Sequence, residues 1–269
     1  MANLRDKPEN NRRIAMLIDG DNAQPSLTEK MLAETSKYGL ITIRRIYGDW
    51  TASNMGGWKD KLQTYAIQPI QQFRYTTGKN ATDSAMIIDA MDILYAGGVD
   101  GFCLVSSDSD YTRLATRIRE KGFFVMGIGK KSTPRAFVNA CDIFVYTQNL
   151  MPQEEQQPAK RTPRRKGQTT QPTATETAPE PEITPEPGPT PDPIPLLKSA
   201  FDIASGEDGW AFLGTLGHHL RQLDPGFDAR TYGYKQLSLL ITALPHVFEV
   251  KEVKSPDGTS VIYVRLKET

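Results

Sequence analysis

Residues 14–22 read IAMLIDGDN, so that five apolar residues, Ile14–Ile18, run directly into Asp19, Gly20, Asp21 and Asn22. An uninterrupted apolar run of this length is typical of a strand buried on both faces, as in a parallel sheet. Gly20 permits a tight turn where that strand ends. We therefore expect the carboxylates of Asp19 and Asp21 to lie at the carboxyl end of a central strand.

Strand-length apolar runs alternate with helical patterns through the rest of the first half of the chain. Further strands are expected at 40–47, 70–75, 101–106, 123–128 and 143–146, and helices at 26–37, 58–65, 82–96, 111–121 and 135–140. This alternation predicts an α/β fold with a mostly parallel sheet and helices on both faces. In such sheets ligands bind beyond the carboxyl ends of the strands.

A second acidic pair follows the expected strand 101–106, in the stretch Ser106-Ser107-Asp108-Ser109-Asp110. Because right-handed crossovers gather strand ends at one edge of a sheet, these carboxylates should meet the first pair. Asp83 opens the expected helix 82–96 and is a third candidate. The alternative is structural, since Asp is a favoured helix N-cap and Asp83, Asp108 and Asp110 all stand where helices begin.

Clustered carboxylates repel one another unless a cation lies between them. Hard cations such as Mg²⁺ or Mn²⁺ suit an all-oxygen site. Residues 1–99 contain no His or Cys, so zinc sites and Ser/His triads have no ligand or base there. Metal-activated water acting on a phosphodiester remains as the chemistry.

These motifs resemble those of NYN domains, a LabA-like branch of the PIN-like nucleases. The resemblance rests on Ile18–Asn22, on Lys79 with Asp83, and on Ser106–Tyr111, and it covers residues 13–150. It implies a metal-dependent ribonuclease in which Asp19, Asp83, Asp108 and Asp110 bind metal or orient water. Asp21 and Asp142 are further candidate ligands. The candidate substrate contacts are Asn22, Arg74, Lys79, Ser107, Lys130 and Lys131.

Two other interpretations of the first region stay open. The Asp19-x-Asp21 pair also resembles haloacid dehalogenase-like phosphatases, although Ala23 stands where that motif expects Thr or Val. Aromatic residues interleaved with basic ones would suit stacking on a single strand, and would equally suit a half-buried core. They are Trp50, Trp58 and Tyr75, among Arg44, Arg45, Lys59 and Arg74.

Composition divides the chain. Residues 151–193 are rich in Pro, Thr, Gln and Glu, which predicts a disordered linker, with a basic cluster at residues 160–166. Beyond it, helical patterns at 196–204, 210–223 and 234–244 precede strands at 247–253 and 260–266, which favours a winged helix. Through Gly209-Trp210, Leu216-Gly217 and Tyr232-Gly233, residues 194–267 are similar to the OST-HTH, or LOTUS, domain, which implies RNA or protein binding. Arg230, Lys235, Lys251 and Lys254 are the candidate recognition residues.

The expected function is therefore an RNA-cleaving metalloenzyme with an added recognition domain. The rival is a non-catalytic RNA-binding or scaffold protein on the same PIN-like fold. Net charge is zero, but residues 1–150 carry 19 basic and 16 acidic groups, so metal binding to the acids would leave that region basic. The first 12 residues are expected to be disordered. The absence of a long apolar run, of a signal pattern and of paired cysteines predicts a cytoplasmic protein without a membrane span.

Overall fold

The first half of the chain forms one parallel sheet. The computed structural model describes residues 12–73, 81–151, 191–206, 208–254 and 260–267. Six strands pair in the order β3-β2-β1-β4-β5-β6, all parallel. Their bounds are Arg13–Asp19 (β1), Leu40–Gly48 (β2), Gln68–Gln71 (β3), Gly101–Val105 (β4), Phe124–Gly129 (β5) and Ile143–Tyr146 (β6). The predicted α/β fold with a PIN-like parallel sheet is confirmed.

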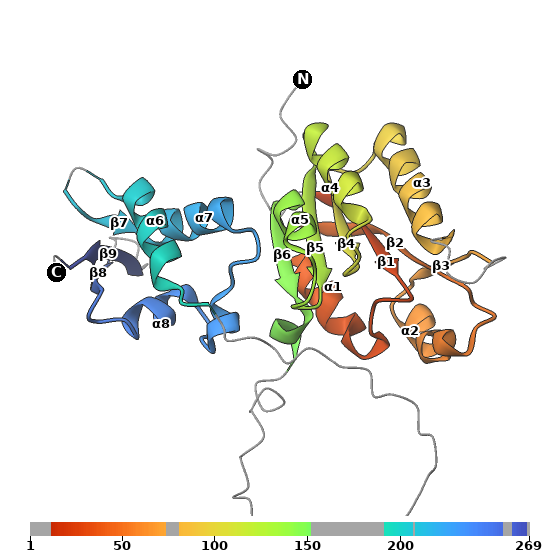
Figure 1. The fold of residues 1–269 in the computed structure, drawn as a ribbon, viewed down its shortest axis with the longest axis horizontal. Coiled ribbons are helices and arrows are strands. Elements are labelled where there is room, and N and C mark those ends of the chain that lie inside the picture. Colours follow the sequence, from red (N-terminus) through yellow and green to blue (C-terminus); the bar gives the residue numbers. More distant parts are fainter. Residues whose placement is uncertain (1–11, 74–80, 152–190, 207, 255–259, 268–269) are drawn as a thin grey trace, which may run out of the picture.

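Helices cover both faces of the sheet (Figure 1). One core lies under α3 (Ala81–Ala96), α4 (Tyr111–Glu120) and α5 (Arg135–Ala140). The other lies under α1 (Thr28–Ser36), α2 (Lys59–Thr64) and the short 3₁₀ helices η3 (Pro25–Leu27) and η4 (Ser53–Trp58). Side chains of β1 alternate between them, with Ala15 and Leu17 in the first core and Met16 and Ile18 in the second. Burial on both faces explains the uninterrupted apolar run.

Strand β3 begins two residues and ends four residues earlier than the sequence predicts. The predicted strand was 70–75, whereas β3 spans Gln68–Gln71 and pairs with the end of β2. It is an edge strand, and its side chains are exposed or half-buried, so no apolar run marks it. The apolar pattern from which strands are predicted arises from burial, and an exposed edge strand lacks that pattern.

The last part of the chain is a small α+β unit with the predicted winged-helix arrangement. Its described residues include the α-helices α6 (Ile194–Ala204), α7 (Leu213–Leu223) and α8 (Leu237–Thr242). Strands β7 (Ala211–Phe212), β8 (Phe248–Lys254) and β9 (Ser260–Leu266) form an antiparallel sheet in the order β7-β9-β8. The predicted helix 210–223 is wrong at its start, because Ala211 and Phe212 pair with β9 before α7 begins.

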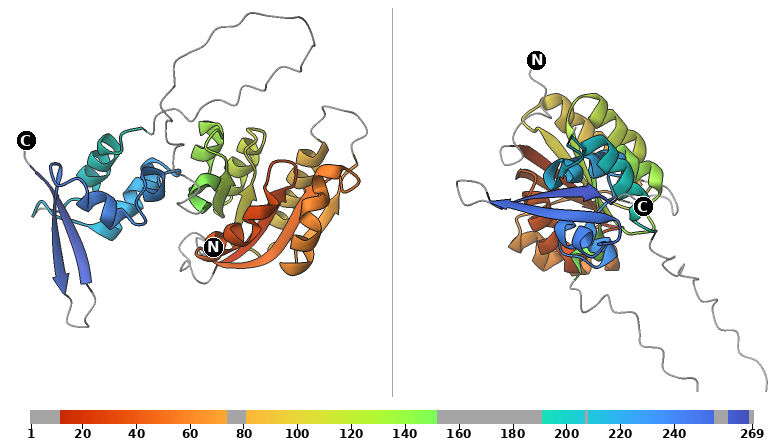
Figure 2. Two further views of the ribbon diagram at one scale, coloured as in Figure 1. Left: turned by 90° about the horizontal axis from the view of Figure 1, so that it is seen from below. Right: turned by 90° about the vertical axis from the view of Figure 1, so that its left-hand side faces the viewer.

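The N-terminal unit (12–151) and the C-terminal unit (191–267) lie side by side, as Figures 1 and 2 show, with β8 and β9 on the far side of the C-terminal unit. The backbone N–H of Phe144, in the edge strand β6, donates to the carbonyl of Pro225 at 2.8 Å. Asn149 Nδ2 donates to Thr231 Oγ1 at 2.9 Å, and Arg135 pairs with Asp224 at 3.2 Å. The C-terminal unit therefore covers an otherwise open sheet edge.

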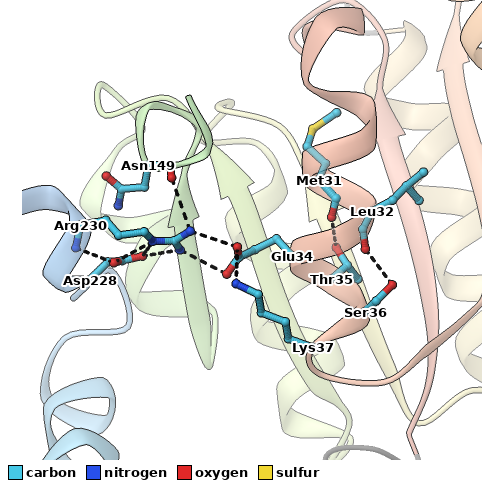
Figure 3. Close-up of polar contacts among 9 residues, drawn as sticks. All are labelled: Met31, Leu32, Glu34, Thr35, Ser36, Lys37, Asn149, Asp228 and Arg230. Carbon is cyan, nitrogen blue, oxygen red and sulfur yellow. Dashed lines mark hydrogen bonds and ion pairs between the residues drawn. The ribbon is translucent and has the colours of Figure 1, made fainter. Parts of the chain in front are cut away.

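One arginine joins the two units most extensively. Arg230 donates to both carboxylate oxygens of Glu34 in α1, at 3.1 and 3.2 Å, and also binds Asp228 (Figure 3). The Glu34 side chain is only 7% exposed, and its other cation is Lys37 at 2.8 Å. A buried carboxylate of the first unit is thus neutralised by the second.

Two expectations fall on residues outside the described ranges. Residues 1–11 of the predicted disordered start and nearly all of the predicted linker 151–193, including its basic cluster, belong to them. The disorder prediction is wrong for Arg12, which is buried. Within the described residues, no helix is both long and apolar enough to cross a bilayer. Cys103 and Cys141 are buried and free, as the lack of cysteine spacing predicts.

Candidate functional site

The topology creates one crevice beyond the strand ends. Strands β1 and β4 are neighbours, but the chain leaves β1 toward α1 on one face and leaves β4 toward α4 on the other. Such a reversal of strand order opens a crevice at the carboxyl ends of the two strands, where open α/β sheets bind ligands. Asp19 ends β1, and Ser106 follows β4 directly. The two acidic motifs therefore meet at this switch point.

Asp19 is buried at the carboxyl end of β1, with 1% of its surface exposed. Its Oδ2 accepts hydrogen bonds from Asn22 Nδ2 at 2.7 Å and from Ser106 Oγ at 2.8 Å, and its Oδ1 accepts from the Asp21 N–H at 3.1 Å. Burial raises the pKa of Asp19, the donors oppose that rise, and the Asp83 carboxylate adds to it. Overall the pKa of Asp19 is raised, so its surroundings in the protein stabilise the ionised carboxylate less well than water does.

Asp83 faces the same crevice from the first turn of α3. Tyr111, buried at the start of α4, donates its hydroxyl to Asp83 Oδ1 at 2.7 Å. Burial raises the pKa of Asp83, the Tyr111 hydrogen bond lowers it, and Asp108, Asp110 and Asp21 raise it by repulsion. The structure therefore brings the other four acids of this region, Asp19, Asp21, Asp108 and Asp110, within electrostatic reach of Asp83.

The loop after β4 is folded by its own side chains. The Asp108 N–H donates to Ser106 Oγ at 3.1 Å, and the Asp110 N–H donates to Asp108 Oδ1 at 2.9 Å. Asp110 is the N-cap residue of α4, but its side chain makes no capping hydrogen bond. The capping explanation for Asp110 is therefore wrong.

The acidic side chains at this site offer carboxylate oxygens, the ligand type that hard divalent cations prefer. Across the described ranges, no three Asp, Glu, His or Cys side chains come close enough together to hold a metal ion. Nevertheless, buried oxygen donors whose pKa values are raised by burial and mutual repulsion are stabilised when a cation lies between them. Mg²⁺ or Mn²⁺ bound largely through water would need only one or two direct carboxylate ligands.

The loop after β5 brings basic residues to this edge. The Lys130 N–H donates to Ser107 Oγ at 2.8 Å, and the Lys131 N–H donates to Gln148 Oε1 at 3.1 Å. Asn22, Ser107 and Lys130 line a cavity of about 10 Å³, close to the space of one water molecule. Both lysine side chains are exposed. The candidate contacts Arg74 and Lys79 lie outside the described residues.

Asp142 is not at this site. It precedes β6, and its Oδ2 accepts from the N–H of Val125 near the start of β5 at 2.8 Å. Residues that precede parallel strands lie at the amino edge of the sheet, opposite the crevice. The prediction that Asp142 is a metal ligand is therefore wrong, because its carboxylate satisfies a backbone donor at the other edge.

The proposed stacking surface is also wrong in part. Trp58 is 1% exposed and belongs to the core, whereas Trp50 donates its ring N–H to the Ile70 carbonyl. Arg44 donates to the Tyr65 carbonyl, and Arg45 pairs with Asp89. Tyr75 lies outside the described residues. For the described side chains, the alternative interpretation as core or half-buried residues therefore holds.

Two members of the predicted basic patch, Arg230 and Lys235, line the same cleft of about 190 Å³. Arg230 is committed to Glu34 and Asp228, so its assignment to ligand recognition is wrong. Lys251 Nζ lies 5.7 Å from the centre of the Trp210 ring, and Lys235 is exposed. The side chain of Lys254 is outside what the structure describes. The recognition roles of Lys235, Lys251 and Lys254 stay predictions.

Two residues hold the site together although no role of their own was predicted for them from the sequence. Ser106 links Asp19 to the loop after β4, and Tyr111 holds Asp83. Both stand inside the motif Ser106–Tyr111, so position in the motif was an available signal. Their contacts could not be predicted from the sequence, because these hydrogen bonds join residues that are 87 and 28 positions apart in the chain.

Fold and site together define a parallel α/β protein with a carboxylate cluster at its switch point. The family model of the NYN domain matches residues 13–150, and the chain belongs to the NYN domain family. A second family model, the OST-HTH/LOTUS domain, matches residues 189–258. NYN domains are nuclease-like, and together the two families support a ribonuclease or RNA-binding role.

Individual relatives are distant. The chain is 29% identical over 127 residues to an uncharacterized protein of Methanocaldococcus jannaschii, over 46% of this chain and 50% of that protein, so it spans about half the length of this curated relative. A protein of unknown function from Vibrio parahaemolyticus is 18% identical, with a TM-score of 0.44, over 52% of this chain and 95% of that one. An uncharacterized protein from Nitrosomonas europaea is 32% identical, with a TM-score of 0.27, over 36% and 94%.

Proposed function

We propose that the protein is a metal-dependent ribonuclease whose active site is the carboxylate cluster at the β1–β4 switch point. One observation carries the proposal: Asp19, 1% exposed, carries a pKa raised by burial and by Asp83, in a crevice that also gathers Asp21, Asp108 and Asp110. A protein with no use for a cation would have little reason to bury Asp19 beside other carboxylates.

The carboxylates divide the work according to their surroundings. Asp19 and Asp108 would hold the cation, with Asn22 and Ser106 fixing the orientation of the Asp19 carboxylate. Asp83, fixed by Tyr111, would complete the ligand set, and Asp110 would orient the attacking water. Asp21 is an additional ligand in this proposal. When bound, Mg²⁺ or Mn²⁺ lowers the pKa of an attacking water and offsets charge on the leaving oxygen.

Substrate contacts would come from the loops that flank the crevice. Lys130, anchored by Ser107, and Lys131 are exposed cations beside the small cavity and would contact RNA phosphates. Asn22 lines the same small cavity, and Arg74 and Lys79 stay candidates from outside the described residues. We further propose that residues 13–150 act as the catalytic domain and 194–269 as an RNA- or protein-binding domain, joined by the linker 151–193.

The alternatives fit less well. A haloacid dehalogenase-like phosphatase would need Asp19 as a nucleophile, but that side chain is buried and its oxygens accept three hydrogen bonds. A non-catalytic RNA-binding protein on the same fold would have its phosphate ligand repelled by the acidic crevice. Metal-independent binding without turnover on any nucleic acid would favour that second alternative.

A substrate panel tests the proposal. Labelled single-stranded RNA, structured RNA and DNA are incubated with wild-type protein in Mg²⁺, in Mn²⁺ and in EDTA. We expect RNA cleavage that requires the cation and that disappears in Asp19→Asn and Asp108→Asn variants with wild-type circular dichroism. Cleavage that persists in both folded variants would show that the active site is elsewhere.

A further inference from the structure

A second candidate site lies between the two units, at the amino edge of the sheet. A cleft of about 880 Å³ opens there between α4, α5 and the start of β6 on one side and α7 on the other. Asp142 and Ile143, at the start of β6, form part of its floor. The cleft and the carboxylate crevice flank opposite ends of β5, which is six residues or roughly 20 Å long. It is therefore separate from the proposed active site.

The charge of this cleft is opposite to that of the crevice. Four arginines and a histidine line it, together with a single carboxylate: Arg12, Arg119, Arg135, Arg221, His218 and Asp142. Asp142 already accepts a hydrogen bond from the Val125 N–H, and the neighbouring Asp224 pairs with Arg135. With Asp224 counted, arginines outnumber carboxylates by four to two. A concave surface with this excess concentrates anions.

Three of the four arginines are held in place by contacts within the protein. The Arg12 guanidinium lies 4.8 Å from the centre of the Phe124 ring, and Arg119 donates to the Asn139 carbonyl at 2.8 Å. Arg135 is fixed by Asp224 at 3.2 Å. A guanidinium carries five N–H donors in a planar fork, so an anchored arginine can still offer donors to a phosphate.

Both units contribute to the cleft, so it exists only while they are docked. Arg221 and His218 come from α7, whereas the other three cations come from the N-terminal unit. We propose that this inter-domain cleft binds the phosphate backbone of an RNA strand at a distance from the scissile bond. The choice of RNA rests on the proposed function, and the cationic lining supports a polyphosphate backbone.

Equilibrium binding in EDTA tests this site without requiring cleavage. A fluorescent oligouridylate, long enough to extend beyond both sites, is titrated with full-length protein, and anisotropy is followed at several salt concentrations. The test variants are Arg221→Glu and Arg119→Glu/Arg221→Glu. The control is Arg117→Glu/Lys198→Glu, which makes the same charge change at exposed positions outside the cleft, one of them on the same helix as Arg119.

We expect the double test variant to raise Kd about tenfold or more, and to reduce the salt dependence of binding by about 0.7 in log–log slope per lost phosphate contact. The control should stay within about twofold of wild type. Equal losses in test and control variants, or none in either, would overturn the proposal, as would polyglutamate competing as well as RNA. If wild type cleaves nothing but binding still depends on Arg221, the proposed function fails and the cleft proposal stands.

Discussion

At the scale of single residues, the site holds charges that the polypeptide alone stabilises poorly. Burial raises the pKa values of both Asp19 and Asp83, although each accepts at least one short hydrogen bond. A protein can keep such groups ionised at neutral pH by binding a cation, at a cost in stability when the cation is absent. The predictions at this scale concern that cost.

Replacing Asp83 by Asn should stabilise the metal-free protein at neutral and higher pH. Its ordinary pKa is 3.8 and its folded pKa is higher, so the folded state binds more protons between those values. The free energy of unfolding therefore falls as pH rises through that window. We expect a higher Tm than wild type at pH 8 in EDTA and no advantage below pH 3.8. Asn keeps an oxygen to accept from Tyr111.

The exposed Asp92, on the same helix, gives the control for that comparison. Asp92→Asn should leave the Tm unchanged at both pH values. A Tm for Asp83→Asn equal to or below that of wild type at pH 8 would mean that Asp83 is adequately stabilised without a cation.

Tyr111→Phe should weaken both the fold and the site. The substitution keeps the buried ring and removes the hydroxyl that donates to Asp83 at 2.7 Å. We expect a loss of about 1 kcal/mol in the free energy of unfolding, measured by urea denaturation. Tyr95→Phe is the control, because Tyr95 is 68% exposed. Equal effects of the two substitutions would indicate that the Tyr111 hydroxyl contributes nothing.

At the scale of secondary-structure elements, the turn that ends β1 determines where Asp19 points. The Gly20 N–H donates to the Tyr47 carbonyl at 2.9 Å, and a Cβ at Gly20 would lie 2.7 Å from that same oxygen. Backbone cannot move aside as a flexible side chain can. Only glycine lets β1 end this close to β2.

Gly20→Ala should therefore destabilise the protein by about 1–3 kcal/mol, as over-packing does. Because the turn shifts Asp19, we also expect the proposed RNA cleavage to fall. Gly56→Ala is a matched control, since nothing lies within 4 Å of a Cβ at Gly56. Thermal unfolding and cleavage rates compare the two, and a Gly20→Ala variant as stable and active as Gly56→Ala would contradict this account.

How much of the structure the sequence predicts also depends on the element. Strands β1, β4, β5 and β6 were predicted closely because each is almost wholly buried and so almost wholly apolar. Strand β3 was displaced because it is exposed, and the two-residue β7 was taken for helix because its strand pairing is with residues some fifty positions later. The carboxylates were predicted from strand ends, but Asp142 was misplaced because adjacency to a strand does not say which end.

At the scale of the whole molecule, docking of the two units creates the inter-domain cleft and covers β6. This arrangement could not be predicted from the sequence, because Arg230 and Glu34 are 196 positions apart and neither belongs to a motif. Arg230 looked like a surface cation of the C-terminal domain. Its pKa is raised by the hydrogen bonds and charges of Asp228 and Glu34, which outweigh the opposing effect of burial.

Arg230→Ala should separate the units, because it leaves the buried Glu34 with Lys37 as its remaining cation. We expect a larger radius of gyration in small-angle X-ray scattering. Hydrogen exchange at the Phe144 amide, which donates to Pro225, should also become faster. The control is Arg117→Ala, which breaks an exposed ion pair with Glu120. Unchanged scattering and exchange would show that Arg230 does not hold the units together.

The most direct test of the central claim is the single-turnover rate of RNA cleavage as a function of Mn²⁺ concentration. Wild type is compared with Asp19→Asn and with Asp60→Asn, a control at an exposed acid of α2. We predict a rate that saturates with Mn²⁺ in wild type and Asp60→Asn, and that is about a hundredfold lower or more in Asp19→Asn at saturating metal. Cleavage by Asp19→Asn at the wild-type rate, or wild-type cleavage that is independent of Mn²⁺, would contradict the account.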